Sequence, residues 1–371
     1  MDFTPSAEQQ LLADSAKRWV SQRCGFDRWQ RERRAGRCLA ELRWPEMAGL
    51  GWAALALPEA HGGLGAGPLE CAIVAESLGR GLVAEPFLQN AVMGAALVQA
   101  LPAGPARDGL ARRLVSGQAR VAIAHAEAGM ADEACAPALQ ARPEGGAWRL
   151  DGGKTAVMGA STLSGLVASA DTGRGAALFW LARDTPGLVL RGYATLDGYR
   201  AADLSFSAVT LADTARLCEP GEAMPILNKV HDAALAAIGA EAVGLMDLLL
   251  EQTLAYTRTR QQFGKPLASF QALRHRMVDM LMQLEAMRSL VLLATLRLAE
   301  GDAAAPRALA AMKAKVGQAG RFIGQQAIQL HGGMGMTDDL VIGHAFKRLM
   351  VLDARLGNTD QQLQRMTAMA A

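Results

Sequence analysis

The chain has 371 residues, of which 51% are hydrophobic and 5% aromatic, and its formal net charge is +2 at pH 7. This length allows roughly two or three domains with a sizeable core, and the small net charge gives no reason to expect a general affinity for nucleic acid. Five scattered cysteines without CxxC spacing indicate reduced thiols instead of a disulfide framework. The opening residues MDFTPSAEQQ lack the pattern of a signal peptide, so we expect a cytoplasmic protein.

The first part of the chain, residues 1–116, is predicted to be a helical domain. Ser6 followed by Glu8-Gln9 is typical of a helix start. A glycine-rich loop follows at Pro58–Gly67, and Leu69–Leu88 returns to helical spacing. Arginines are clustered between Arg23 and Arg37. A solvated helix face is the simplest interpretation of that cluster, and an attraction for phosphates or for a partner subunit is the alternative.

Residues 117–222 are predicted to form a middle β domain. Short apolar runs there are separated by Gly, Asp and Pro, without helical patterns between them. Strands at this spacing favour an antiparallel barrel or sandwich. The predicted strands lie in Val121–His125, Trp148–Leu150, Leu178–Leu181, Leu188–Leu190 and Leu204–Leu211.

Residues 223–371 are predicted to be helical again. Met277, Met280 and Leu284 lie on one apolar face at helical spacing, where methionine is most simply core filler. The most apolar run, Ala233–Leu250, contains acidic residues, which argues against a membrane span. We therefore expect a C-terminal helical bundle and no membrane segment.

One polar stretch, Tyr256–Gln271 with the sequence YTRTRQQFGKPLASFQ, interrupts this helical region. Gly264 frees the backbone and Pro266 forbids further regular helix, so a helix–loop–helix corner is expected. Arginine and glutamine at such a corner can bind a phosphate or a flat heteroaromatic ring, although a solvated helix end is the simpler alternative. The sequence has no GxGxxG after a strand, no P-loop and no metal-ligand spacing of its six histidines.

The stretch resembles the RxxFGxxxxxxQ signature of the flavin-dependent acyl-CoA dehydrogenases. A second segment that resembles a family signature, QLHGGMGM, occupies Gln329–Met336. A third lies near the N-terminus and consists of Gly51-Trp52, Pro58-Glu59 and Gly62–Gly65. The resemblance implies a mostly helical α+β fold, with an N-terminal helical domain, a middle antiparallel β-barrel and a C-terminal four-helix bundle. It also implies FAD as cofactor, acyl-CoA as substrate and an electron-transfer flavoprotein as acceptor.

The resemblance also implies which residues bind the cofactor. In that family the Arg, Phe and Gln of the first signature, with the Gln and Gly of the second, contact the FAD of a neighbouring subunit. The matching positions are Arg260, Phe263, Gln271, Gln329 and Gly333. An arginine is suited to the pyrophosphate, and a glycine lets backbone N–H groups approach its oxygens. A shared site of this kind requires an oligomer.

The segments that meet the flavin ring match the family less well. The family's aromatic-Cys-Val-Thr-Glu segment is Ile123–Glu127 here, and its Trp-Ile-Thr segment begins after Lys154. Both family threonines are replaced, by Ala126 and Met158, and the tryptophan is replaced by Ala156. The contacts with the ring must therefore differ or come from the backbone.

The family's catalytic base is also replaced. The reaction removes an α-proton while the β-hydride moves to flavin N5, and it needs a carboxylate with a raised pKa. Most members carry it at the position of Leu356, and a minority at the position of Ala234. Glu241 and Asp353 are the candidate substitutes, since Glu241 lies nearly two helical turns after Ala234 and Asp353 shortly before Leu356. An internal ion pair for Glu241 and a solvated loop position for Asp353 are the alternatives.

The segment HGGMGMTDDLVIGHAFKRL further resembles the small subunits of pimeloyl-CoA dehydrogenase-type enzymes and of paired dehydrogenases for steroid side chains. We therefore predict α,β-dehydrogenation of an acyl-CoA thioester to the trans-2-enoyl-CoA, with an atypical or partner-supplied base. The assembly is then a homo-oligomer or an α2β2 heterotetramer. A non-catalytic flavin-binding subunit, an acyl-CoA oxidase and a nucleic-acid-binding relative are the alternatives, the last favoured only by the Arg23–Arg37 cluster.

Overall fold

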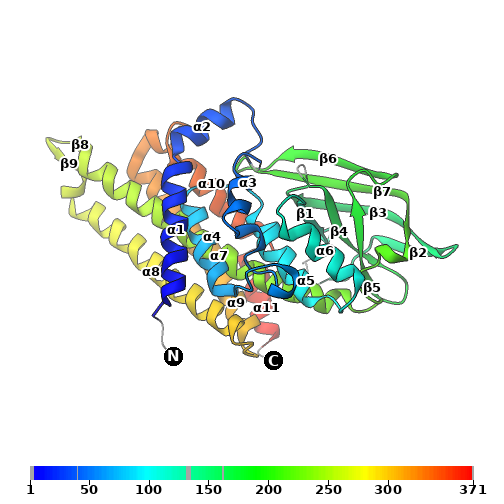
Figure 1. Ribbon diagram of the computed structural model, residues 1–371. Coiled ribbons are helices and arrows are strands. Elements are labelled where there is room, and N and C mark those ends of the chain that lie inside the picture. Colours follow the sequence, from blue (N-terminus) through cyan, green and yellow to red (C-terminus); the bar gives the residue numbers. More distant parts are fainter. Residues whose placement is uncertain (1–3, 40, 131–134, 161–162, 370–371) are drawn as a thin grey trace. The chain divides into compact units, whose positions relative to one another are not determined.

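The computed structural model describes the whole chain except residues 1–3, 40, 131–134, 161–162 and 370–371 (Figure 1). The chain forms two compact units. The first comprises residues 1–36, 68–83 and 235–371, and the second comprises residues 37–67 and 84–234. The sequence-based division into residues 1–116, 117–222 and 223–371 stays a prediction.

The first unit is mainly helical. The predicted cap at Ser6 is confirmed, because its hydroxyl accepts from the Gln9 N–H and the Gln9 side chain accepts from the Ser6 N–H. The helices are α1 (Ala7–Arg23), α2 (Phe26–Arg34), α4 (Pro68–Arg80), α7 (Ala223–Thr259, which begins in the second unit), α8 (Gln271–Ala299), α9 (Ala305–His331), α10 (Val341–Ala354) and α11 (Thr359–Ala368), with the 3-10 turns η5 (Leu267–Ser269) and η6 (Gly332–Met336).

Helices α4 and α7 cross through backbone contact at two glycines. A Cβ atom at Gly244 would overlap the carbonyl oxygen of Glu76, and one at Gly79 would overlap that of Glu241. Only glycine allows so close an approach of two helices. The crossing therefore fixes the register of α4 against α7.

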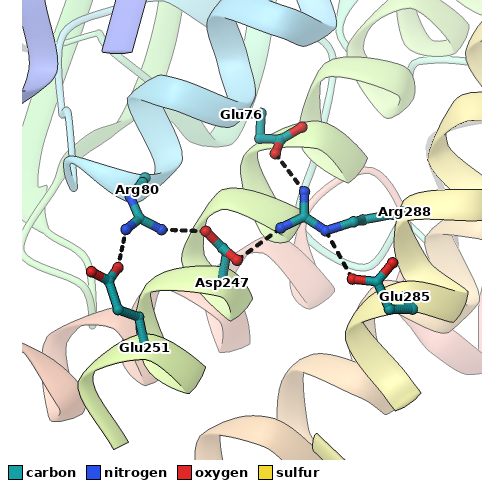
Figure 2. A network of polar contacts seen from close by, with 6 residues as sticks. All are labelled: Glu76, Arg80, Asp247, Glu251, Glu285 and Arg288. Atoms are coloured by element: carbon teal, nitrogen blue, oxygen red, sulfur yellow. Dashed lines mark hydrogen bonds and ion pairs between the residues drawn. The ribbon is translucent and has the colours of Figure 1, made fainter. Parts of the chain in front are cut away.

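A network of ion pairs joins α4, α7 and α8 beside this crossing (Figure 2). Arg288 lies 2.9 Å from Glu76 and 2.8 Å from Asp247. Burial raises the pKa of Glu76, and the charge of Arg288 opposes that rise. The side chains are about a third exposed or more, so each pair stabilises the fold only modestly. The remaining pairs are Arg80 with Asp247, Arg80 with Glu251, and Arg288 with Glu285.

The apolar helix α7 is long and apolar enough to cross a membrane by composition alone. Most of its apolar stretch is buried within the protein. It also carries Glu241, paired with Arg348, and Asp247, which belongs to the network of Figure 2. These features are typical of the core helix of a helical bundle.

The second unit holds a seven-stranded sheet in the order β1-β4-β2-β3-β7-β6, with β5 paired to β4. The strands are β1 (Val121–Ala124), β2 (Gln140–Glu144), β3 (Ala147–Met158), β4 (Gly165–Asp171), β5 (Ala176–Ala182), β6 (Leu188–Ala194) and β7 (Arg200–Ala212). Its short helices are α3 (Trp44–Gly49), α5 (Ala95–Ala100) and α6 (Pro105–Val115), with η1 (Trp52–Ala54), η2 (Glu59–His61), the π-helical η3 (Phe87–Gly94) and η4 (Asp213–Ala215).

The predicted α+β class with a mostly helical chain is confirmed, with one correction. The middle sheet is mixed and not purely antiparallel, because β1 pairs in parallel with β4 and β2 touches β4 in parallel. The β2–β3 hairpin lies between β1 and β4 in the sequence. The connection between β1 and β4 is therefore long enough for a parallel pair, which a short hairpin loop could not join.

Candidate cofactor and active site

The first signature forms the turn between α7 and α8. Strands β8 (Gln261–Gln262) and β9 (Lys265–Pro266) form a hairpin that projects beyond these helices (Figure 1). Its two turn residues, Phe263 at φ 53° and Gly264 at φ 75°, are both left-handed, as a tight two-residue hairpin requires. The Phe263 side chain is 90% exposed, so the turn presents an aromatic ring to whatever binds there.

The polar members of the first signature, Arg260 and Gln271, are also exposed. Arg260 follows the last residue of α7 and Gln271 opens α8. Within the described part of the chain, neither side chain has a hydrogen-bond or ion-pair partner. A guanidinium and an amide are therefore free to bind an external group.

The second signature ends α9 and continues into η6. Gln329 is exposed, and at Gly333 an added Cβ would meet no atom within 4 Å, so the backbone there is open. His331 is buried, and its Nδ1 lies 2.8 Å from the carbonyl oxygen of Ala327. This contact supports the structural role that its position in the helix suggests.

A ring stack brings the two signatures together. The rings of Tyr256 and His331 lie 4.3 Å apart at 25°, and the Tyr256 hydroxyl donates to the His331 carbonyl at 3.4 Å. Tyr256 stands one turn before Arg260, and His331 adjoins the glycines of η6. The donor set of the two signatures, one guanidinium, two amides and an open glycine backbone together with an exposed aromatic ring, fits the pyrophosphate and flat ring of a dinucleotide.

The two segments expected at the flavin ring also meet, in the second unit. The Thr155 N–H donates to the Ala126 carbonyl at 2.9 Å, and the fully buried Lys154 lies 2.5 Å from Glu127. The Lys154 ammonium also donates to Ser169 and to the His125 carbonyl, each at 3.0 Å. Glu127 of the first segment, with Lys154 and Thr155 of the second, lines a cavity of about 550 Å³, so this ion pair borders open space.

Opposite forces set the pKa values of this pair. Burial lowers the pKa of Lys154 to about 8, although the charge and hydrogen bond of Glu127 oppose the shift. Burial raises the pKa of Glu127, but the hydrogen bonds from Lys154 and from the Leu139 N–H outweigh it, and the net shift is downward. Both groups are therefore charged at neutral pH, and each is the counter-charge of the other in this buried ion pair.

These shifts predict a pH dependence of stability. Between about pH 8 and roughly pH 10.4, the ordinary value for lysine, the folded chain binds fewer protons at Lys154 than the unfolded chain. The free energy of unfolding should therefore rise with pH in this window, by on the order of 2 kcal/mol. Urea denaturation across the window should show the rise in the wild type and in Lys229→Met, an exposed control, but not in Lys154→Met. A rise of equal size in Lys154→Met would contradict this assignment.

Neither position of the family base carries an acid. Ala234 is fully buried in α7. Leu356 follows α10 with a left-handed φ of 53°, and Gly357 continues at φ 86°. The segment after α10 is thus a tight turn that bears an apolar side chain at the usual position.

The two substitute carboxylates both have structural partners. Glu241 accepts from the buried Arg348 side chain at 2.6 Å, the internal ion pair that was the alternative for it. Asp353 lies buried in α10, where its carboxylate accepts from the Thr359 N–H at 3.1 Å and hydroxyl at 2.9 Å. Buried Lys313 closes the same turn by donating to the carbonyls of Asp353 and Gly357. Either carboxylate would have to leave these partners to act as a base.

Sequence reasoning missed the buried contacts around the expected sites. Ser169, which bonds both Lys154 and His125 Nδ1, lies in β4, a strand that the sequence did not predict. In the described residues, no group of three His, Cys, Asp or Glu side chains could hold a metal ion.

Comparison with known proteins gives this geometry its context. Family models described as acyl-CoA dehydrogenase N-terminal and C-terminal domains match residues 6–101 and 232–370. Acyl-CoA dehydrogenase FadE27 of Mycobacterium tuberculosis is 26% identical, covering 98% of this chain and 97% of its own. The human mitochondrial short-chain specific acyl-CoA dehydrogenase is 28% identical, and the match covers 85% of this chain and 79% of the human chain.

A solved assembly is similar over the whole chain. In the ChsE4-ChsE5 complex from Mycobacterium tuberculosis, the matching chain is 26% identical with a TM-score of 0.88, covering 100% of this chain and 99% of that one. The two family models, the relatives that match over most of their length and the contact between the two signatures all indicate the same family. The chain therefore belongs to the acyl-CoA dehydrogenase family.

Proposed function

We propose that this chain works as a FAD-dependent acyl-CoA dehydrogenase that shares its site with a second acyl-CoA dehydrogenase chain. The reaction is the α,β-dehydrogenation of an acyl-CoA thioester to the trans-2-enoyl-CoA in the cytoplasm, with an electron-transfer flavoprotein as acceptor. The observation that carries the proposal is the Tyr256–His331 stack, which joins two signatures whose cofactor-binding candidates Arg260, Gln271 and Gln329 have exposed side chains.

Each signature residue has a role that its chemistry supports. The Arg260 guanidinium offsets the charge of the pyrophosphate in a forked contact. The amides of Gln271 and Gln329 orient the cofactor by hydrogen bonds, and Gly333 admits it close to the backbone. Phe263 packs against a ring. Bound FAD supplies the hydride acceptor.

The paired assembly is supported by an exposed apolar face of α8. Large apolar side chains there recur at helical spacing and stay accessible to solvent, which marks a protein-binding surface. They are Val278, Leu281, Met282, Leu292 and Leu293. The similar ChsE4-ChsE5 structure is itself described as a complex of two named chains. A partner chain also explains why Leu356 and Ala234 can stand where a base is expected, since the partner then supplies the carboxylate.

The alternative is a non-catalytic flavin-binding subunit that stabilises its partner, and the partnered state of Glu241 and Asp353 favours it. An anaerobic titration of the isolated chain and of the chain co-expressed with its partner tests both. We expect acyl-CoA to bleach the flavin of the pair and not that of the isolated chain. Complete bleaching by the isolated chain would rule out a partner-supplied base.

The candidate carboxylates give a second prediction. Glu241→Gln and Asp353→Asn, made separately in the paired enzyme, should each leave the turnover of acyl-CoA within about twofold of wild type. Removal of a true general base costs roughly 10²–10⁴-fold. A loss of that size in one variant, with flavin content and thermal unfolding unchanged, would place the base on this chain.

The cofactor contact gives a third prediction. Arg260→Gln should lower the affinity for FAD by roughly tenfold or more, because a charge-assisted hydrogen bond to phosphate is lost. Arg258→Gln, an exposed arginine two residues earlier, is the matched control and should retain the wild-type flavin content. The ratio of flavin to protein absorbance after dialysis measures both. Equal flavin loss in both variants would count against a specific role for Arg260.

A further inference from the structure

Helix α2 differs from the other helices of the first unit because so little of it is buried. Of its nine residues only Trp29 is buried. A glycine lies on each side of the helix, Gly25 directly before it and Gly36 two residues after it. Gly36 has a left-handed φ of 69°, and a Cβ atom at either glycine would meet no atom within 4 Å. A segment with few buried side chains and glycine at both ends can open locally at low free energy.

We propose that α2 is a lid over a cavity of the first unit and that His344 of α10 is its latch. The lid is closed while the His344 ring is neutral, and it opens when the ring takes up a proton. The cavity has a volume of about 940 Å³, and Phe26 and Asp27 of α2 line it together with residues 339–342 at the entry to α10. The proposal is independent of the flavin chemistry above.

The contact between α2 and α10 is centred on the His344 ring. This ring lies 4.8 Å from the Trp29 ring and 5.6 Å from the Phe26 ring, measured between centroids. Trp29 and His344 are only 2% and 3% exposed, so the two rings exclude water from each other. Aromatic contacts of this kind stabilise a helix pair beyond the area that they bury. The docking of α2 therefore depends on the state of His344.

The polar contacts around these rings are more exposed. Arg34 of α2 pairs with Asp339 at 2.9 Å through side chains that are 63% and 70% exposed. An ion pair in that environment contributes little to stability. Gln30 donates to the carbonyl oxygen of Asp338 at 2.6 Å, also at an exposed position. These contacts guide α2 to its place but do not replace the ring cluster.

The hydrogen bonds of His344 fit the neutral ring. Nη1 of Arg33 lies 3.5 Å from Nδ1 of His344, and a guanidinium can only donate, so Nδ1 is the acceptor. Nε2 lies 3.1 Å from the carbonyl oxygen of Asp338, which can only accept, so Nε2 carries the hydrogen. A second proton would have to bind at Nδ1. It would remove the contact with Arg33 and set two positive charges against each other between α2 and α10.

The surroundings of the ring disfavour its protonated form. Burial lowers the pKa of His344 below its ordinary value of 6.5, and the positive charges of Arg33 and Lys347 act in the same direction. The carbonyl and the carboxylate of Asp338 act in the opposite direction, but the net shift is downward. The carboxylate lies 3.7 Å from Nε2 and is itself paired with Lys347 at 3.5 Å, which weakens its effect on the ring.

This shift sets the direction of the pH effect. The pKa of His344 is lower in the docked state than in the released state, so below about pH 6.5 the released state binds more protons. The free energy needed to release α2 is therefore highest above this pH and decreases as the pH falls. One pH unit below 6.5, the released population should be larger by up to roughly tenfold. Protonation of a buried histidine opens interfaces in other proteins by the same linkage.

Hydrogen–deuterium exchange of the purified protein, with its partner where the two co-purify, tests the latch at pH 7.5 and pH 5.5. Mass spectrometry of peptides reports each helix separately, and the rates are corrected for the intrinsic exchange rate at each pH. We expect the protection of the α2 amides to fall by roughly three- to tenfold more than that of α9, the largely buried helix of the same unit.

Variants assign the effect to His344. His344→Phe keeps a ring against Trp29 but cannot take up a proton, so its α2 should show no greater loss than α9. Arg33→Met removes the cation that faces Nδ1 and should reduce the loss. His275→Phe, at an exposed histidine of α8, and Arg31→Met, at an exposed arginine of α2, are the matched controls and should keep the full loss.

Two results would overturn the proposal. One is an α2 whose protection relative to α9 is the same at both pH values. The other is an undiminished loss in His344→Phe, or in Arg33→Met where the buried substitution prevents folding.

Discussion

Replacement of Gly244 by alanine is expected to lower the free energy of unfolding by about 3 kcal/mol or more. The added methyl group would overlap the Glu76 carbonyl oxygen and lie 2.9 Å from the Arg80 nitrogen. Both are backbone atoms of α4, so no side-chain rotation relieves the overlap. The helices must separate, and the ion pairs of Figure 2 between α4 and α7 separate with them. Urea denaturation measures the loss, and Gly244→Leu should yield little folded protein.

Gly343→Ala provides the matched control. Gly343 lies in α10, and its added Cβ would meet its nearest atom at 3.6 Å, an ordinary contact. Alanine is the better helix former, so this variant should be neutral or more stable by roughly 0.5–1 kcal/mol. An equal loss in both variants would mean that any glycine substitution in the helices is harmful, and that the crossing has no special role.

Replacement of Arg43 by methionine is expected to cost roughly 3–5 kcal/mol. Arg43 Nε lies 2.7 Å from Glu85 Oε1, and the two side chains are 2% and 0% exposed. The same carboxylate oxygen accepts from the Arg43 N–H at 3.1 Å. The variant keeps this backbone contact but leaves a buried carboxylate without its countercharge, which is the costly outcome of breaking such a pair.

A double-mutant cycle separates the charge effect from lost packing. Arg43→Met with Glu85→Gln removes both charges, so it should recover at least about 1 kcal/mol of the loss. Arg120→Met is the matched control, because its ion pair with Glu41 is partly exposed, at 28% and 46%, and should contribute less than about 1 kcal/mol. A double variant no more stable than Arg43→Met would show that side-chain volume, and not the unpaired charge, dominates.

The sequence predicts the parts of this fold that have a local signal. Apolar periodicity indicates the long helices, and short apolar runs between turn residues indicate β1, β3, β5, β6 and β7. Strands β2 and β4 escaped prediction because QARPE is polar and contains proline, and GLVASAD is made mostly of small residues. Their strand conformation depends on pairing with neighbours, such as the full pairing of β4 with β5.

The candidate site likewise depends on contacts between residues far apart in the sequence. The signatures locate Arg260 and Gln329 by spacing alone, but the Tyr256–His331 stack that joins them links residues 75 positions apart. The role of Glu241 likewise depends on Arg348, which lies 107 residues later in the chain. Long-range partners of this kind leave no periodic pattern in the sequence, so a carboxylate in an apolar helix leaves both a base and an ion pair open.

The first unit has a consequence for how the protein is made, since its helices come from three separate stretches of the chain. Helix α4 ends at Arg80, but the α7 glycine against which it packs is residue 244. At roughly 5–20 residues per second, the ribosome needs on the order of ten seconds or more to bridge that interval. During this time the face of α4 that packs against α7 is uncovered, which makes the nascent chain a natural client of chaperones.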